Sequence, residues 1–202
     1  MTTILLTGFG PFPGAPFNPT WPLVKRLAQK QRAGVKIVPH IFATSYAAVD
    51  RDLPKLIARY KPDAIVMFGL ASRARGLRVE TRAQNAIALL PDVTGKTPRR
   101  GAIAAGKPAA VPMPMSATSL LAAIHFAGVP TRRSRDAGTY LCNYLCWRAA
   151  EAAGKANGPR LAAFVHVPLV ARGRQKAKTS ELTLDDLARA GAAALTAIAR
   201  HV

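Results

Sequence analysis

Short apolar runs alternate along this chain with longer segments of helical period, and this alternation restricts the fold more than any other feature of the sequence. An apolar run that is bounded by turn residues and is too short for a helix predicts a buried strand. Strands that alternate with helices in this way predict an α/β fold. The strands are expected at residues 3–9, 35–42, 64–70 and 161–167, and the helices at 18–33, 46–60, 118–126, from 139 or 140 to 153, and from Thr183 to 198.

Local signals define the ends of several helices. Asn18-Pro19 is a cap and first-turn pair for the helix that begins there. Thr183-Leu184-Asp185-Asp186 offers an N-cap with acids in the first turn. Pro54 is expected to interrupt or offset the helix that contains it. The middle of the chain has little periodicity, so we expect extended segments within 77–90 and a surface loop over 92–114.

The size and composition of the chain predict one domain. Half of the 202 residues are apolar and no linker divides them, so we expect a single domain over residues 1–202. The first residues lack the basic lead and long apolar stretch of a signal peptide, and no window approaches a membrane span. Cys142 and Cys146 would share one face of a helix rather than form a disulfide framework. We therefore expect a cytoplasmic protein without a membrane partner.

The chain carries a formal charge of +19 and has a pI near 11.2, which would suit a phosphate backbone or an acidic partner. The basic residues are scattered, however, and they lack the interleaved aromatic residues of a base-stacking surface. We therefore expect solvated basic loops and do not expect nucleic acid as a partner. The basic positions include Lys25-Arg26, Arg73 and Arg75, Arg99-Arg100, Arg132-Arg133 and the stretch 172–178.

Cys142 is the first candidate for chemistry, because it follows a small-residue turn at the start of a predicted helix. The unpaired N–H groups and the positive dipole end of a helix favour an anion, so a thiol placed there tends toward the nucleophilic thiolate. Such a cysteine is catalytic only if a histidine and an orienting acid or amide come from elsewhere in the sequence. For Cys146, the simpler interpretation is a small buried hydrophobe.

His166 is the best placed of the histidines. It lies at the carboxyl end of an apolar strand, where ligands of open α/β sheets gather. His40 stands beside Pro39, His125 lies among apolar residues of a predicted helix, and His201 is at the end of the chain. The alternative for His166 is a satisfied histidine of the sheet without a chemical role.

Glu80 is a candidate for the orienting acid, because it follows the turn after the buried strand 64–70. A carboxylate that accepts the imidazole N–H fixes the tautomer of a catalytic histidine and stabilises its imidazolium. The alternative for Glu80 is a surface carboxylate paired with Arg78 or Arg82.

Five segments of the chain, in order and over nearly its whole length, resemble the pyroglutamyl peptidase I family of cysteine peptidases. The segments are Leu6-Thr7-Gly8-Phe9-Gly10-Pro11-Phe12-Pro13-Gly14, Asn18-Pro19-Thr20-Trp21, Gly69-Leu70-Ala71 with Glu80 and Asn85, Ala137-Gly138-Thr139-Tyr140-Leu141-Cys142-Asn143, and Phe164-Val165-His166-Val167-Pro168. The resemblance implies a single-domain three-layer α/β/α sandwich around a mixed, mostly parallel sheet, assembled as a homotetramer.

The resemblance also implies an activity and a site. Cys142 would be the nucleophile, His166 its base and Glu80 the orienting acid of a cysteine exopeptidase. That enzyme would remove N-terminal pyroglutamate from peptides through an acyl-enzyme, with no metal or other cofactor. The lactam ring needs apolar faces and a few backbone donors and acceptors, and Phe9 and Phe12 would either supply those faces or pack in the core. The implied substrate-binding residues are Phe9, Phe12, Asn18, Gly69 and Leu141.

The chain departs from the family pattern around and after Glu80. Thr81-Arg82 stands where the family usually has an arginine and then an aliphatic residue, and the turn at 72–75 carries arginines one position to either side of the usual one. Segment 85–92 lacks the aspartate and arginine that typically precede Pro-Asp, and it is one residue shorter. That arginine lies near the family's active site. We expect its loss to change the efficiency of the chemistry or the shape of the pocket, unless another arginine of this segment replaces it.

Two alternative functions stay open on the sequence alone. The same fold and triad could act on another lactam or blocked N-terminus, which a panel of lactam and acyl amides would reveal. The chain could also be a catalytically weak scaffold whose basic surface binds anions or nucleic acid. Steep salt dependence of binding that survives Cys142→Ser would favour the scaffold.

Overall fold

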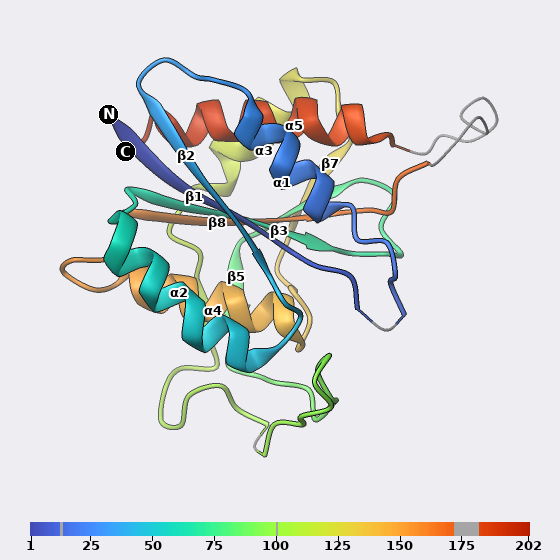
Figure 1. Ribbon diagram of the computed structural model, residues 1–202, viewed down its shortest axis with the longest axis vertical. Helices are drawn as coiled ribbons and strands as arrows, with labels where there is room; N and C mark the ends of the chain where they lie inside the picture. The colour runs from blue at the N-terminus through green and yellow to red at the C-terminus, as the bar shows by residue number, and fades with distance from the viewer. Residues whose placement is uncertain (13, 100, 172–181) are drawn as a thin grey trace.

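Two buried strands form the middle of a six-stranded sheet in this protein. β3 (Ala64–Leu70) and β8 (Leu161–Val167) pair in parallel, and nearly all of their residues are buried. A strand that is buried on both faces requires helices on each side of the sheet. The computed structural model describes residues 1–12, 14–99, 101–171 and 182–202 (Figure 1). Pro13, Arg100 and the basic stretch 172–178 lie outside the described residues.

The remaining strands extend to both sides of this pair in the order β2-β1-β3-β8-β4-β7. On one side, β1 (Thr2–Phe9) and β2 (Val35–Phe42) continue the parallel arrangement. On the other side, β4 (Leu77–Glu80) runs antiparallel to β8, and β7 (Thr131–Ser134) runs parallel to β4. A separate antiparallel pair consists of β5 (Arg82–Gln84) and β6 (Ala110–Pro112).

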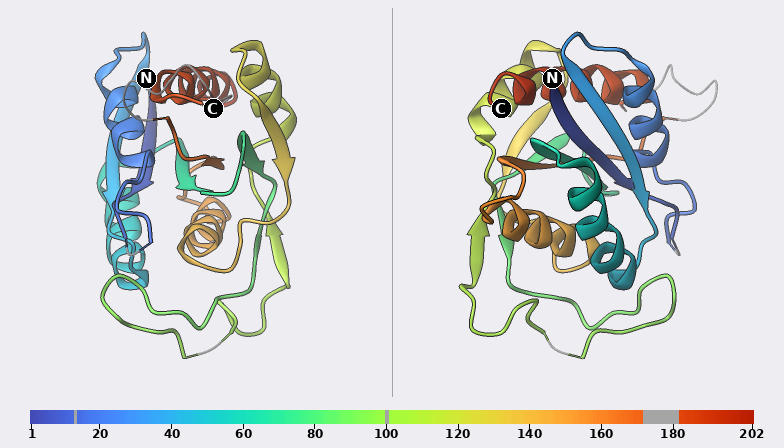
Figure 2. Two further views of the ribbon diagram at one scale, coloured as in Figure 1. Left: turned by 90° about the vertical axis from the view of Figure 1, so that its right-hand side faces the viewer. Right: turned by 60° about the vertical axis from the view of Figure 1, so that its left-hand side comes forward.

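Helices cover both faces of the sheet, as the side views in Figure 2 show. Successive side chains of a strand point to opposite faces, so Val66 of β3 packs in one apolar core and Met67 packs in the other. The three-layer α/β/α sandwich around a mixed, mostly parallel sheet is therefore confirmed. The first core lies under α1 (Thr20–Gln29), α3 (Ala117–Phe126) and α5 (Leu184–Ala199), and the second under α2 (Tyr46–Tyr60) and α4 (Leu141–Ala153).

Four elements have the bounds expected from the sequence. β2, α2, β3 and β8 begin and end where their apolar patterns do. Pro54, however, does not interrupt α2, which is continuous over 15 residues. Pro54 and Asp50, the residue four positions earlier, are both exposed, so water can serve the carbonyl that the missing N–H leaves free.

Two further expectations about the elements are wrong, and one strand was not expected. The first helix begins at Thr20 and ends at Gln29, because Lys30 is extended and Gly34, with a φ of +71°, turns the chain into β2. The 92–114 stretch is not loop throughout, since it contains β6. The sequence also gives no sign of β7, because this strand lies at the edge of the sheet and its polar residues show no alternation.

One edge of the sheet collects the segments that matter for function. The carboxyl end of β8 and the start of β4 lie there together, because the two strands are antiparallel and Arg78 is level with His166. The carboxyl end of β3 lies at the same edge, where Gly69 is level with His166 on the other side. A cavity or site at this edge would therefore be built from residues far apart in the sequence.

Helix α5 begins with the capping box predicted for Thr183. The Thr183 hydroxyl accepts from the backbone N–H of Asp186, and the Asp186 carboxylate accepts from the backbone N–H of Thr183 at 2.8 Å. These hydrogen bonds lower the pKa of Asp186. The cap therefore fixes the point at which α5 begins.

We expect Thr183→Ala to lower the free energy of unfolding by about 1 kcal/mol, because it leaves an N-terminal N–H of α5 without its partner. Urea denaturation followed by circular dichroism measures the change. Thr196→Ala is the matched control, since the Thr196 hydroxyl only donates to the Ala192 carbonyl within the same helix. Equal losses in the two variants would contradict a capping role.

Candidate active site

Three polar side chains singled out from the sequence meet at this edge of the sheet. Glu80 is the last residue of β4, His166 the next to last of β8, and Cys142 the second residue of α4. In the register of β4 with β8, Arg78 is opposite His166 and Glu80 is opposite Phe164. Glu80 is therefore the diagonal neighbour of His166 on the face that α4 covers.

A buried hydrogen bond joins Glu80 to His166. The Nδ1 atom of His166 lies 2.8 Å from Oε1 of Glu80, and the two residues are only 5% and 2% exposed. An ionised carboxylate can only accept, so Nδ1–H is the donor. The other carboxylate oxygen, Oε2, is buried and has no hydrogen-bond partner within the described part of the chain. Glu80 is thus not the surface carboxylate paired with Arg78 or Arg82 that the sequence also allowed.

The neighbours of His166 raise its pKa. Burial alone would lower the pKa of His166, because it strips water from the charged ring. The charge of Cys142 and its hydrogen bond to the ring outweigh burial, together with the hydrogen bond and charge of Glu80, and they raise the pKa of His166 to about 9. Because Nδ1 is bonded to Glu80, Nε2 is the nitrogen left for the hydrogen bond to Cys142.

The turn before Cys142 is fixed by its own polar groups. Gly138 has a φ of +78°, a conformation that favours glycine, and its N–H donates to the Asp136 carboxylate at 2.9 Å. The N–H of Asp136 donates in turn to the Ser134 hydroxyl at the end of β7. Tyr140 is the extended N-cap residue, so α4 begins at Leu141 and Cys142 lies in its first turn, half-buried. The small-residue turn expected from the sequence is present.

Asn143 attaches the first turn of α4 to the segment that follows Glu80. Its side-chain amide donates to the carbonyls of Gln84 and Ala86 at 2.8 and 2.9 Å, and its side-chain oxygen accepts from the N–H of Gln84 at 2.8 Å. Asn143 is fully buried. From the sequence, Asn143 is only a member of the cysteine segment with no predicted role, although an amide beside apolar residues of a helix is a signal of such an attachment.

A cavity of about 170 Å³ lies beside Cys142 and His166. This is smaller than the ~300–1,000 Å³ of pockets for drug-sized ligands, so it suits a single small ring. Four of the five residues expected to bind substrate line it. The lining consists of Phe9, Phe12, Asn18, Thr44, Leu70, Ala137, Gly138, Thr139, Tyr140, Leu141, Cys142 and His166.

Asn18 contributes to this cavity mainly by shaping its wall. Its side-chain amide donates to the Gly10 carbonyl, and its side-chain oxygen accepts from the N–H and the hydroxyl of Thr20. The hydroxyl of Thr44, a lining residue that sequence reasoning missed, donates to the same Gly10 carbonyl at 3.3 Å. These bonds hold the loop after β1 against the ends of α1 and β2.

Gly69 is the expected substrate residue that does not line the cavity. A Cβ atom at this position would lie 2.5 Å from Cζ of Phe164 and 2.8 Å from Sγ of Cys142. Gly69 therefore leaves room for the sulfur of Cys142 above β3. Its neighbour Leu70 lines the cavity instead.

The segment in which the chain departs from the family pattern runs past the cavity without sending a charge into it. Ala88 donates its N–H to the Thr139 carbonyl at 2.6 Å, and Leu89 and Leu90 are more than half exposed. The Tyr140 hydroxyl donates to the Pro91 carbonyl at 2.9 Å. None of the described lining residues is an arginine, so no arginine of this segment takes the place of the missing one.

Cys146 is fully buried, and burial is the main reason that its pKa lies well above the usual value. It is thus the small hydrophobe expected at this position.

Among the described residues, no group of three histidine, cysteine, aspartate or glutamate side chains could hold a metal ion, and no helix could span a membrane.

Comparison with known proteins leads to one group. A family model described as pyroglutamyl peptidase matches residues 2–201. A pyrrolidone-carboxylate peptidase of Streptococcus pyogenes is 34% identical over 200 residues, which cover 96% of this chain and 91% of the relative. The solved pyrrolidone carboxyl peptidase from Thermococcus litoralis superposes with a TM-score of 0.90 at 26% identity, covering 100% of this chain and 94% of that one. Pyroglutamyl peptidase I from Bacillus amyloliquefaciens gives a TM-score of 0.87 at 29% identity over 98% of both chains.

We expect Gly69→Ala to slow the alkylation of Cys142 by iodoacetamide by about tenfold or more, because the added methyl group displaces the sulfur from its place beside His166. The rate is measured near neutral pH by mass spectrometry of the labelled peptide. Gly154→Ala is the control: the nearest atom to an added Cβ there is 3.6 Å away, at the far end of α4. Unchanged reactivity in Gly69→Ala would contradict this role of the glycine.

We expect Glu80→Gln to lower the pKa of His166 from about 9, because the amide oxygen still accepts from Nδ1–H while the negative charge is gone. NMR titration of the imidazole ring measures it, and His40 provides an internal reference at a distant site. A raised pKa stabilises the folded state fully below the unfolded value of 6.5, and this contribution is lost as the pH rises through about 9. The free energy of unfolding should therefore fall over this range, and fall less in Glu80→Gln. An unchanged titration of His166 would show that the carboxylate is not responsible.

Proposed function

The chain belongs to the pyroglutamyl peptidase family, and we propose that it hydrolyses the amide bond after an N-terminal pyroglutamyl residue with Cys142, His166 and Glu80 as its catalytic triad. It is a cysteine peptidase of this type. The observation that carries the proposal is the buried Glu80–His166 hydrogen bond, because His166 and Cys142 together line a cavity small enough for one ring.

The first step joins the sulfur of Cys142 to the carbonyl carbon of the pyroglutamyl group. His166 holds the proton that the thiol has given up, and Glu80 stabilises the resulting imidazolium. The negative charge that develops on the carbonyl oxygen is accepted by backbone N–H groups of the first turn of α4, that of Cys142 included. Each such donor typically lowers the barrier by about 3 kcal/mol.

The second step releases the shortened peptide. His166 donates its Nε2 proton to the leaving nitrogen as the C–N bond breaks, which leaves a thioester on Cys142. A water molecule then gives a proton to His166 and attacks the thioester carbon. The C–S bond breaks, pyroglutamate leaves, and the thiolate and imidazolium are restored.

The cavity fits the proposed substrate because both are compact and because its described lining, apart from Cys142 and His166, has no charged side chain. Phe9, Phe12 and Leu141 offer apolar surface for the faces of the lactam ring. Asn18 and Thr44 hold the loop that contains Gly10, and Gly69 leaves room for the sulfur of Cys142 beside the cavity. An ordinary N-terminal ammonium would find no carboxylate among the described lining residues.

Membership of the family supports a proposal about the wider setting. We propose that residues 1–202 act as one catalytic domain in the cytoplasm, that the substrates are peptides with N-terminal pyroglutamate, and that four copies assemble. Analytical ultracentrifugation tests the assembly directly.

The purified, reduced protein should hydrolyse pyroglutamyl-aminomethylcoumarin, and Cys142→Ala should lower the rate by ~10³-fold or more because it removes the nucleophile. Release of the fluorescent amine measures the rate. Cys146→Ala is the matched control and should retain activity, since this thiol is buried away from the cavity.

Absence of turnover by the unmodified protein across neutral pH would end the proposal. Turnover of a different lactam or acyl amide in preference to the pyroglutamyl one would keep the triad and reassign the substrate. The cavity without an arginine is the feature that makes this second outcome worth testing.

A further inference from the structure

A second hollow, of about 400 Å³, lies at the same edge of the sheet and is rich in arginine. Arg73 and Arg75 reach it from the turn after β3, Arg78 from β4 and Arg132 from β7. No acidic residue lines it, and none of the four arginines forms an ion pair with a carboxylate among the described residues. The hollow therefore concentrates positive charge that the described protein does not neutralise.

The strand register places two of these charges side by side. Arg78 and Arg132 are direct partners in the parallel pairing of β4 with β7, so their side chains project from the same face of the sheet. Like charges in directly opposed positions destabilise a sheet. A bound anion between the two guanidinium groups would relieve this repulsion.

The same register connects the arginines to the proposed active site. Gly69, His166, Arg78 and Arg132 follow one another in a single row across β3, β8, β4 and β7. Neighbouring strands are ~4.8 Å apart, so the backbone of Arg78 is one strand spacing from that of His166 and Arg132 is two. The ring cavity lies on the other side of His166, toward β1, where Phe9 and Phe12 line it.

We propose that this arginine hollow binds a carboxylate of the departing peptide, and that the protein prefers substrates with an acidic residue shortly after pyroglutamate. The inference rests on the proposed function, because it takes His166 as the group that protonates the leaving nitrogen. An extended peptide advances ~3.3 Å per residue, so a departing peptide that runs along this row would bring the side chains of its first three residues to Arg78 and Arg132. Guanidinium groups pair with carboxylates through paired hydrogen bonds as well as charge.

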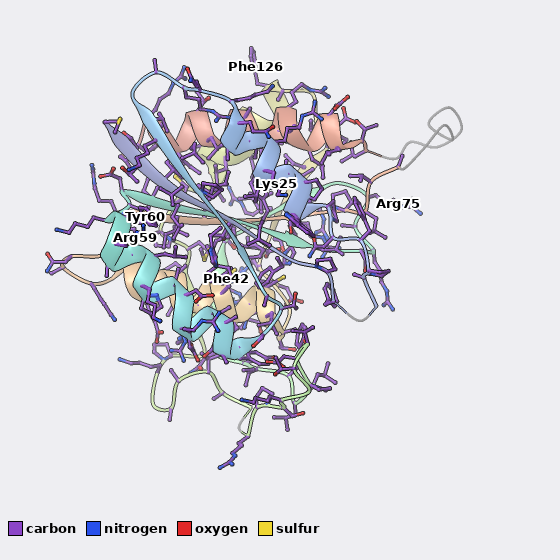
Figure 3. All side chains as sticks on the ribbon, in the orientation of Figure 1. Lys25, Phe42, Arg59, Tyr60, Arg75 and Phe126 are labelled. Atoms are coloured by element: carbon purple, nitrogen blue, oxygen red, sulfur yellow. The ribbon has the colours of Figure 1, made fainter. Side chains whose placement is uncertain are left out.

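A peptide fits this hollow better than nucleic acid does. Its nine described lining residues include no aromatic side chain on which a base could stack. The hollow also adjoins the proposed cleavage site, whereas a nucleic-acid surface would need no such position. Figure 3 shows Arg75 projecting outward at one side of the molecule, with Arg59 at the opposite side.

The test compares two amidated substrates that differ at one residue, pyroglutamyl-Ala-Glu-Ala-amide and pyroglutamyl-Ala-Gln-Ala-amide. We expect kcat/KM for the glutamate peptide to exceed that for the glutamine peptide by about tenfold, as one or two well-placed ion pairs would give. Arg78→Gln and Arg132→Gln should each reduce this ratio severalfold, and added salt should reduce it as well. Release of pyroglutamate by chromatography measures both rates.

Arg59→Gln is the matched control, because it removes the same charge from the end of α2 and should leave the ratio unchanged. A ratio near one in the unmodified protein, or an equal loss in Arg59→Gln, would overturn the inference while leaving the proposed function intact. Thermal melts of the three variants check that each is folded.

Calorimetric titration of both peptides into the Cys142→Ala protein tests the hollow without any turnover. Tighter binding of the glutamate peptide, reduced in Arg78→Gln, would support the inference even if the proposed function failed. Equal affinity for the two peptides would overturn it. A short single-stranded oligonucleotide that binds more tightly than the glutamate peptide at about 0.15 M salt, and less tightly to Arg78→Gln, would assign the hollow to nucleic acid instead.

Discussion

The buried hydrogen bond between Glu80 and His166 is the interaction on which the rest of the site depends. A carboxylate taken out of water is costly, and here one of its oxygens lacks a hydrogen-bond partner among the described residues. The hydrogen bond from His166 offsets part of that cost, and the pKa of His166 is raised by its interactions with Cys142 and Glu80. None of the three groups has its proposed role alone. The sheet must therefore hold Glu80 and His166 in register while the Asn143 attachment holds the helix that carries Cys142.

That requirement explains why the sheet is mixed. In the described sheet, β4 with β8 is the one antiparallel pair. Because β4 is antiparallel to β8, the first residues of β4 lie at the edge where β8 ends. Glu80, the last residue of β4, lies farther inside the sheet and contacts His166 from there. One short strand thus places Glu80 behind His166 and Arg78 beside it. A parallel β4 would have brought its carboxyl end to the edge and exposed the glutamate to water.

The sequence predicts those parts of the molecule that depend on local pattern. The buried strand with His166 and the helix start with Cys142 both follow from apolar runs and turn residues, and their expected bounds agree with the structure to within two residues. Glu80 does not follow from local pattern, because an acid between arginines is typical of a surface ion pair; only the strand pairing identifies it as the partner of His166. β7 has almost no recognisable sequence pattern, because an edge strand needs no apolar alternation. The hydrogen bonds of the Asn143 side chain are not predictable either, because they reach a backbone segment that only the tertiary fold brings close.

The positive charge of the chain illustrates the same limit. In the sequence, Arg78 and Arg132 are 54 positions apart and are two of many dispersed basic residues. In the sheet, Arg78 and Arg132 are neighbours, and the row of residues that contains them also contains His166. Composition sets the total positive charge of the surface, but the strand order decides where the positive side chains cluster. Arginines that cluster beside the proposed cleavage site would act on the substrate, because the electrostatic field of these arginines is strongest over the few ångströms that the leaving peptide must cross.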